Sequence, residues 1–291
     1  MFECRKTCNL CGSEDPKILV SKDFSDPCIW DFLDKYYEGR IDEKDVEGGK
    51  YEIARCGKCG FMWQTQILDD SAMGKLYGRW ISSEESLQKQ QNDTDLLVVY
   101  KGEVATFITL IDKDPDEIDV LDFGMGWGHF CLTAKEFGCN AYGHELSEER
   151  IEFARGNGIG IVEDFTEGHK FDFINSEQVF EHIADPLGTL KMLASHLKEG
   201  GVIRIGVPNG SGVTRKLKNK SWKAAKDAIH PLEHINCFTH KTLKRLAKEA
   251  GLKFIKQPRI EVFRPGLNPY VKSLLGKHYR QRLGTTLYFK K

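Results

Sequence analysis

A glycine-rich turn that follows a short apolar run constrains this chain of 291 residues more than any other feature. The run at Val120 and Leu121 is typical of a buried strand, and Asp122 stands at its end. Glycine then occupies every second position before a helical pattern begins, at Gly124, Gly126 and Gly128. Glycine lets the backbone turn sharply with positive φ and lets a ligand approach main-chain atoms closely. The pattern predicts a strand, a cofactor loop and a helix, and the alternative is a glycine turn that binds nothing.

The spacing of the glycines indicates which cofactor the loop takes. A dinucleotide fingerprint, G-x-G-x-x-G, needs its third glycine at the position of His129. The pattern D-x-G-x-G-x-G resembles motif I of the class I S-adenosylmethionine-dependent methyltransferases. S-adenosylmethionine carries no phosphate and bears an ammonium and a sulfonium, so an acid such as Asp122 suits it better than a bare helix N-terminus. The resemblance implies that the cofactor contacts the residues of this loop, Asp122, Gly124, Met125, Gly126 and Gly128.

Two further acids stand where strands are expected to end. Residues 140–145 read as a second strand closed by Glu145, about twenty residues past the glycines, where a doubly wound fold places the carboxylate that binds the ribose hydroxyls. Residues 162–165 would put Asp164 at the end of a third strand. In the family this acid commonly meets the adenine amino group and the next apolar side chain packs on the ring, so we expect Glu145, Leu146, Asp164 and Phe165 at the cofactor. The alternative is that these acids are only exposed strand ends.

The segment 171–186 reads as a fourth strand and its exit, and it is similar to the F-D-x-I…V-x-E-H-x-x-D-P segment of small-molecule members of this family. Ligands lie outside the carboxyl ends of parallel strands, so we expect the residues from Asn175 to Gln178, Glu177 among them, to border the methyl donor. A turn-stabilising pair explains Glu181 and His182 as well as catalysis does.

Strands alternate with helices over residues 118–209, which predicts an α/β, doubly wound, Rossmann-like fold with a mostly parallel sheet. A strand at 285–289 would complete seven strands, the last one antiparallel.

Two C-x-x-C-G motifs near the N-terminus indicate a metal site. The motifs contribute Cys8, Cys11, Cys56 and Cys59. Four thiolates can close a tetrahedral, structural Zn²⁺ site, and the glycine after each second cysteine allows the tight turn that aims N–H groups at sulfur. A redox dithiol is the competing interpretation. The spacer should carry a small sheet or a helical excursion near residues 29–37.

Length and composition favour an intracellular, cytoplasmic protein of two or three parts. We expect a zinc-binding module at 1–68 and a helical connector or lid at 69–115. The connector contains polar helix-forming stretches at 82–85 and 88–91. A methyltransferase domain should follow at 116–291, with a substrate-facing insertion at about 210–240. No apolar run approaches the length of a membrane span, and the formal net charge of −1 gives no global attraction for nucleic acid. The basic stretch 215–226 is interpreted as a solvated helix face in preference to a phosphate-contacting surface.

Substrate chemistry is expected after the fifth strand, where Glu233 and His234 stand next to each other. The pair resembles the E-H-x-x-x-F-[ST] segment of zinc-carrying sugar C-methyltransferases and related small-molecule methyltransferases, in which it handles the substrate proton. His234 is the natural base near neutral pH, and Glu233 could orient it or abstract a proton from carbon. The alternative is that both residues only tie the loop to the sheet. A tyrosine normally accompanies the pair in the C-methyltransferases, and none stands within several residues upstream here.

Three functions follow from these patterns. The first is methyl transfer from S-adenosyl-L-methionine to a small hydroxylated acceptor, a nucleotide-linked sugar or glycan precursor, on oxygen or carbon. The second is an RNA base methyltransferase whose zinc module grips nucleic acid, although the neutral charge and the N-S-E-Q strand exit oppose it. The third is a non-catalytic zinc-module adaptor, which the intact Gly124, Gly126, Gly128 and Glu145 oppose. The sequence does not identify the acceptor or the oligomeric state.

Overall fold

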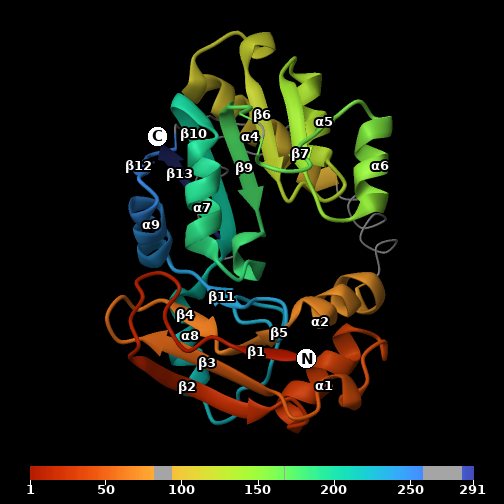
Figure 1. The fold of residues 1–291 in the computed structure, drawn as a ribbon, viewed down its shortest axis with the longest axis vertical. Helices are drawn as coiled ribbons and strands as arrows, with labels where there is room; N and C mark the ends of the chain where they lie inside the picture. Colours follow the sequence, from red (N-terminus) through yellow and green to blue (C-terminus); the bar gives the residue numbers. More distant parts are fainter. Residues whose placement is uncertain (82–93, 167, 258–283) are drawn as a thin grey trace, which may run out of the picture. The chain divides into compact units, whose positions relative to one another are not determined.

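The computed structural model describes residues 1–81, 94–166, 168–257 and 284–291. The chain divides into two compact units (Figure 1). Unit 1 holds the described residues of Met1–Ser86, Glu181–Pro186 and Pro208–Leu243, and unit 2 holds those of Leu87–Phe180, Leu187–Val207 and Lys244–Lys291.

Unit 1 is built on a small antiparallel sheet with the order β11-β4-β3-β2. Its strands are β2 (Pro16–Asp23), β3 (Lys50–Cys56), β4 (Met62–Gln64) and β11 (Asn236–Cys237), and a second pair joins β1 (Phe2–Cys4) to β5 (Gln66–Leu68). β11 stands much later in the sequence than the other three strands and pairs Asn236 with Trp63. The expected substrate segment therefore completes the sheet of the cysteine module.

Helices of unit 1 cover a core rich in aromatic side chains. They are α1 (Pro27–Tyr36), η1 (Glu43–Asp45), α2 (Asp70–Lys75), η2 (Leu76–Trp80), η5 (Gly210–Gly212) and α8 (Val213–Leu217). The short helix η4 (Phe180–His182) has Phe180 in unit 2 and its last two residues in unit 1. α1 begins with Pro27 at its first turn and with Asp26 as its N-cap, whose carboxylate accepts from the Cys28 N–H. The helix then buries Ile29 and Leu33. It confirms the helical excursion predicted near residues 29–37.

Unit 2 contains a seven-stranded sheet with the order β12-β13-β10-β9-β6-β7-β8. Its strands are β6 (Asp119–Phe123), β7 (Asn140–His144), β8 (Gly160–Ile161), β9 (Phe171–Glu177), β10 (Leu197–Pro208), β12 (Lys253–Ile255) and β13 (Gly284–Lys290). The five strands from β10 to β8 are parallel, and β12 is antiparallel to β13. The α/β fold with a seven-stranded, mostly parallel sheet is therefore confirmed.

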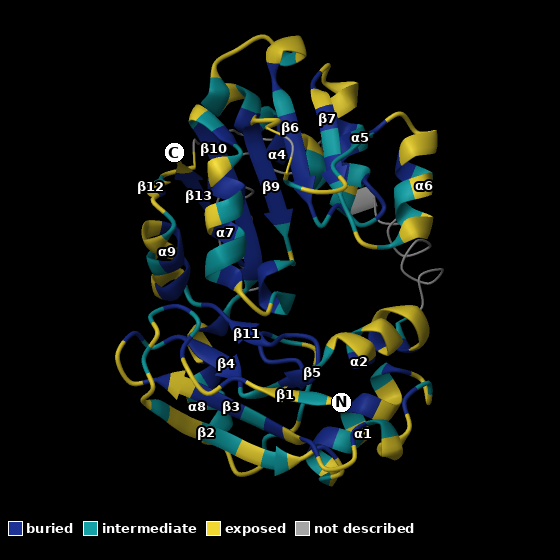
Figure 2. Ribbon diagram, in the orientation of Figure 1, coloured by how far each residue is buried: buried dark blue, intermediate teal, exposed yellow. Residues whose placement is uncertain are grey.

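The helices associated with this sheet are α4 (Thr94–Ile111), η3 (Pro115–Glu117), α5 (His129–Glu136), α6 (Glu148–Gly156), α7 (Pro186–Ser195) and α9 (His240–Glu249). Phe107 of α4 stacks on Phe173 of β9 with ring centroids 4.4 Å apart, and Phe130 of α5 packs beside both. Figure 2 shows the central strand β9 as buried and α6 with an exposed outer face. This packing fixes the strand ends that carry the predicted cofactor residues.

Two local predictions were wrong. The third strand was expected at 162–165, but β8 ends at Ile161 because Asp164 instead closes a local turn, accepting from the Thr166 N–H at 2.8 Å. The basic stretch 215–226 was expected to be helical, but α8 ends at Leu217. Asn219 accepts from the Ser221 N–H at 3.1 Å, and this side chain to backbone bond competes with helix continuation.

The helical connector is described only in part, by α2, η2 and α4, and the stretches 82–85 and 88–91 lie outside the described residues. The division at residues 68 and 115 stays a proposal. The structure groups the whole of the expected insertion at 210–240 with the cysteine module, in unit 1.

Candidate cofactor and acceptor sites

The glycine loop leaves β6 with three left-handed residues, Gly124 at φ 76°, Gly126 at φ 55° and Gly128 at φ 73°. A Cβ on Gly124 would lie 2.5 Å from Val179, and one on Gly128 would lie 2.8 Å from Ile159, so both glycines are needed for packing. A Cβ on Gly126 would meet nothing within 4 Å. The middle glycine therefore presents open backbone, which is the feature that a ligand crossing the loop requires.

Glu145 lies directly after β7 and holds the loop. Its Oε2 accepts from the Gly126 N–H at 3.0 Å, and its Oε1 accepts from the N–H groups of Leu146 and Ser147 at 2.8 and 3.1 Å. Arg150 lies 3.6 Å from Oε2 as well, so a ligand hydroxyl would share with these groups the roughly four lone-pair sites that a carboxylate offers. The structure thus joins the loop to the acid that was expected to bind ribose.

A buried polar network supports the strand ends beneath the loop. The Asp122 carboxylate accepts from Asn175 Nδ2 at 2.7 Å, and Asn175 Oδ1 accepts from Arg204 at 2.7 Å. Arg204 also pairs with Glu177 at 2.6 Å. Burial raises the pKa of Asp122 to about 7, against the opposing effects of Asn175 and Arg204. Asp122 is therefore a carboxylate whose charge a nearby cation would stabilise.

The remaining predicted cofactor residues differ in exposure. Gln178 lies beyond β9 with a left-handed φ of 56°, a conformation that non-glycine residues adopt rarely and that often marks functional sites. Leu146 is 88% exposed, whereas Met125 is buried against Gly143. Asp164 is exposed, and Phe165 packs edge-on to the His144 ring at 5.2 Å.

Glu233 and His234 lie in unit 1, in a tight turn after Asp227. His234 donates through Nδ1 to the Asp227 carbonyl, which leaves Nε2 with the free lone pair. Gln64 of β4 donates to the carbonyls of His230 and His234 at 2.9 and 3.0 Å. These bonds anchor the turn to the cysteine-module sheet.

The structure adds a tyrosine that the neighbouring sequence lacks. Tyr37, at the end of α1, donates its hydroxyl to Glu233 Oε1 at 2.8 Å, and both side chains are buried. His230 Nε2 lies 3.6 Å from the same oxygen. Sequence reasoning missed both residues. His230 stands three residues before Glu233, and this spacing was an available signal. No motif near Glu233 in the sequence indicates Tyr37.

His182 also belongs to this cluster. Its ring lies edge-on to that of His234 with centroids 5.0 Å apart, and the His230 ring lies 5.2 Å from His234. Burial lowers the pKa of His182 to about 3 and that of His234 to about 4, and it lowers the pKa of His230 well below its usual range. All three imidazoles are therefore neutral at pH 7 and can accept protons.

The buried histidines predict acid sensitivity of unit 1. An unfolded histidine has a pKa of about 6.5, so unfolding takes up protons as pH falls below that value, and the free energy of unfolding decreases between pH 6.5 and 4. Each such histidine contributes about 1.4 kcal/mol per pH unit in this window. We expect urea titrations of His230→Phe at pH 7, 6 and 5 to show a shallower loss of stability than wild type. The exposed His240→Ala serves as control, and equal slopes for His230→Phe and wild type would contradict the prediction.

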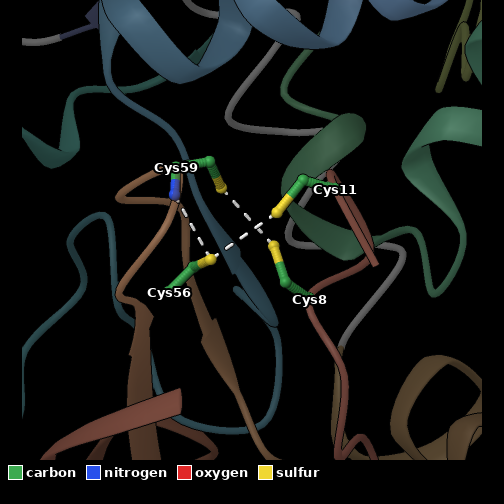
Figure 3. A group of neighbouring side chains, drawn as sticks. All are labelled: Cys8, Cys11, Cys56 and Cys59. Carbon is green, nitrogen blue, oxygen red and sulfur yellow. Dashed lines mark hydrogen bonds between the residues drawn. The ribbon is translucent and has the colours of Figure 1, made fainter. Parts of the chain in front are cut away.

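The four cysteines of the two C-x-x-C-G motifs meet in one cluster (Figure 3). Cys8 Sγ lies 3.5 Å from Cys59 Sγ, and Cys11 Sγ lies 3.6 Å from Cys56 Sγ. Each of these contacts joins one motif to the other, which favours a shared ion over two separate redox pairs. A tetrahedral zinc with bonds of about 2.3 Å would separate its sulfurs by about 3.8 Å, so small shifts would fit the ion.

The glycines of both motifs shape the turns as expected. Gly12 and Gly60 have φ values of 66° and 79°, and the Cys59 N–H donates to Cys56 Sγ at 3.3 Å. N–H groups aimed at sulfur stabilise the thiolate form that binds metal. The cluster therefore has the donor set of a closed structural site.

Comparison with known proteins places the chain in a family. Residues 100–257, more than half of the chain, match the family described as "Methyltransferase domain". The chain belongs to this family and, by its fold and its glycine loop, to the class I S-adenosylmethionine-dependent methyltransferases. The cysteine cluster lies outside the matched residues.

Two curated relatives carry the same name, "Ubiquinone biosynthesis O-methyltransferase". The protein of Chelativorans sp. (strain BNC1) is 31% identical over 108 residues, 33% of this chain and 43% of its own length. That of Actinobacillus pleuropneumoniae serotype 5b (strain L20) is 31% identical over 144 residues, 40% of this chain and 62% of its own length. The matches thus span only about half the length of these relatives.

A solved structure shares the fold. The plantazolicin methyltransferase BpumL, in complex with a triazolic desmethylPZN analog and SAH, covers 75% of this chain and 93% of its own, with a TM-score of 0.52 and 16% identity. Among the described residues, no helix combines the length and apolar character needed to cross a bilayer.

Proposed function

We propose that the protein transfers the methyl group of S-adenosylmethionine to a small hydroxylated acceptor, a nucleotide-linked sugar or glycan precursor. The observation that carries the proposal is the buried Tyr37, Glu233 and His234 cluster, because it offers proton acceptors in a protein whose family transfers methyl groups. The names of the curated relatives, O-methyltransferases, support oxygen as the acceptor atom.

On the cofactor side, the open backbone of Gly126 would carry the adenosylmethionine, with Glu145 on the ribose hydroxyls and Asp122 on the ammonium. The other predicted cofactor residues would surround the bound adenosylmethionine. They are Asp164, Phe165, Glu177 and Gln178, with Leu146 and Met125 beside them. The bound cofactor supplies a methyl group on a positive sulfur, open to in-line displacement. An opposite charge lowers the pKa of a buried carboxyl, so the ammonium would hold Asp122 ionised.

On the acceptor side, His234 would take the proton of the reacting hydroxyl through Nε2. Its Nδ1–H is held by the Asp227 carbonyl, so the imidazole is fixed in the tautomer of a base. Its pKa of about 4 keeps it neutral at pH 7, although it is then a weaker base than an exposed histidine. Alignment of the acceptor would therefore contribute much of the rate.

Glu233 would position the acceptor or take a proton from carbon. Burial raises its pKa, and the hydrogen bond from Tyr37 opposes that effect. The sequence-based objection to carbon methylation was the absence of a nearby tyrosine, and Tyr37 fills that place from α1. Methylation on oxygen or on carbon therefore remains within the proposal, with a structural Zn²⁺ holding the module that supplies Tyr37.

Replacing His234 with alanine tests the base. We expect turnover, followed as transfer of a labelled methyl group to nucleotide sugars, to fall by about 10²- to 10⁴-fold, the usual contribution of a general base. Affinity for S-adenosylhomocysteine should not change. The exposed His240→Ala is the matched control and should keep full turnover. Full turnover in His234→Ala with an accepted substrate would overturn the assignment.

A further inference from the structure

A pocket of about 580 Å³ opens beside α8 in unit 1. Its volume falls in the usual range for small-molecule sites, about 300 to 1,000 Å³. The residues that line it come from a single stretch of chain, Gly212, Arg215, Lys216, Asn219, Ser221, Trp222 and Lys223. No predicted cofactor or acceptor residue lines it, so the pocket is distinct from the two candidate sites described above.

The local fold brings together two cations, Arg215 and Lys223, that a continuous helix would hold about 12 Å apart along its axis. α8 ends after Leu217, and Asn219 then accepts from the N–H groups of Ser221 and Trp222, through its side chain and its carbonyl respectively. The Ala224 N–H donates to the Cys28 carbonyl at 2.9 Å, which fixes the far end of the turn. Lys223 is thereby brought to the same pocket as Arg215 and Lys216.

The charge of this stretch is weakly compensated. Residues 215–226 contain six basic side chains and no acid. Lys216 pairs with Asp227, and Lys223 pairs with Asp31 at 3.4 Å through side chains that are 71% and 61% exposed. Such exposed pairs contribute little and yield easily to a better partner. Arg215 forms no ion pair with any residue that the structure describes. The pocket is therefore suited to an anion with more than one charge.

An aromatic wall accompanies the cations. Trp222 lines the pocket, and its ring stacks on Tyr51 with centroids 5.8 Å apart and planes 13° apart. Tyr51 in turn donates its hydroxyl to the Ile229 carbonyl at 2.5 Å, next to His230. A supported aromatic side chain beside basic ones is the combination that holds a base and its phosphates.

Within unit 1, residues 215–226 are connected by side-chain contacts to the cluster of Tyr37, Glu233 and His234. Lys226 Nζ lies 5.3 Å from the centroid of the Tyr36 ring, and that ring packs edge-on to His230 at 4.5 Å. His230 lies 3.6 Å from Glu233. An elongated acceptor could therefore be held at both places.

We propose that this pocket binds the diphosphate of a nucleoside diphosphate-linked acceptor, with Arg215 and Lys223 on the phosphates and Trp222 against the nucleoside. The proposal rests on the proposed function, because it names the class of acceptor. It also reverses the interpretation of residues 215–226 as a solvated helix face. A pocket of this size and a net charge of −1 fit one nucleotide better than an RNA strand.

The test is calorimetric titration of the full chain with UDP, pyrophosphate and uridine. We expect UDP to bind at least tenfold more tightly than uridine and pyrophosphate to compete with UDP. In the double variant Arg215→Gln/Lys223→Gln, the affinity for UDP should fall at least tenfold. Lys17→Gln, an exposed lysine on β2 of the same unit, is the matched control and should bind UDP as wild type does. Both variants should melt like wild type, since the replaced groups are exposed.

Equal affinities for UDP and uridine, or an unchanged affinity in the double variant, would overturn the proposal. If the protein binds a single-stranded RNA more tightly than UDP, and the double variant loses this RNA binding, the pocket proposal is overturned and the surface is an RNA-binding one. S-adenosylhomocysteine binding, measured in the same samples, separates this proposal from the proposed function. If the protein binds UDP but not S-adenosylhomocysteine, the pocket proposal stands and the proposed methyltransferase function fails. If it binds S-adenosylhomocysteine but not UDP, only the pocket proposal fails.

Discussion

Replacing Cys56 with serine should abolish the binding of the proposed structural zinc ion and unfold unit 1. Cys56 lies at the end of β3, and its sulfur contacts both Cys11 of the other motif and the Cys59 N–H. Binding of structural zinc is worth about 10 to 16 kcal/mol, which is comparable with the whole stability of a typical domain. Loss of one ligand should therefore separate the N-terminal segment from the β3–β4 turn.

The measurement is native mass spectrometry for the metal and tryptophan fluorescence for the fold. Four of the five tryptophans, Trp30, Trp63, Trp80 and Trp222, belong to unit 1, so fluorescence reports mainly on that unit. Cys4→Ser is the matched control, because Cys4 is exposed and lies outside the cluster. It should keep one zinc per chain. A metal-free Cys56→Ser protein with wild-type fluorescence and melting would show that the cluster is not a structural zinc site.

Replacing Gly126 with valine should abolish cofactor binding while the protein stays folded. Valine at a φ of 55° is strained, and its branched side chain would enter the open space over the loop where the cofactor would lie. The Gly126 N–H bond to Glu145 would be disturbed as well. We expect affinity for S-adenosylhomocysteine, measured by calorimetry, to fall at least a hundredfold.

Gly251→Val separates backbone strain from ligand contact. Gly251 also has a positive φ, 81°, with nothing within 4 Å of a Cβ, but it follows α9 and not β6. Its variant should lose a similar amount of stability and bind the cofactor as wild type does. Equal losses of affinity in the two variants would mean that the effect of Gly126→Val is only strain.

The fold of unit 2 was predictable because its signals are local. The glycine loop, the acid after the second strand and the alternation of strands and helices each lie within a few tens of residues. The third strand was predicted too far along the chain, at 162–165. β8 ends at Ile161, and the Asp164 side chain accepts from the Thr166 N–H in a local turn that follows it. The cysteine cluster was predictable for the same reason, since spacing within each motif identifies the ligands.

The acceptor cluster could be predicted only in part. Glu233 and His234 form a local motif, but Tyr37 stands 196 residues away and reaches Glu233 only because β11 completes the module sheet. The basic pocket escaped for a related reason. The predicted helix placed these cations along a solvated face. In the structure the turn at Asn219 brings Arg215 and Lys223 to one pocket.

The most direct test is calorimetric titration of the zinc-loaded chain of 291 residues with S-adenosylhomocysteine. The account predicts saturable binding at one site per chain, carried by the loop of Gly124, Gly126 and Gly128 and by Glu145. The absence of saturable binding to a folded, zinc-loaded protein would contradict it.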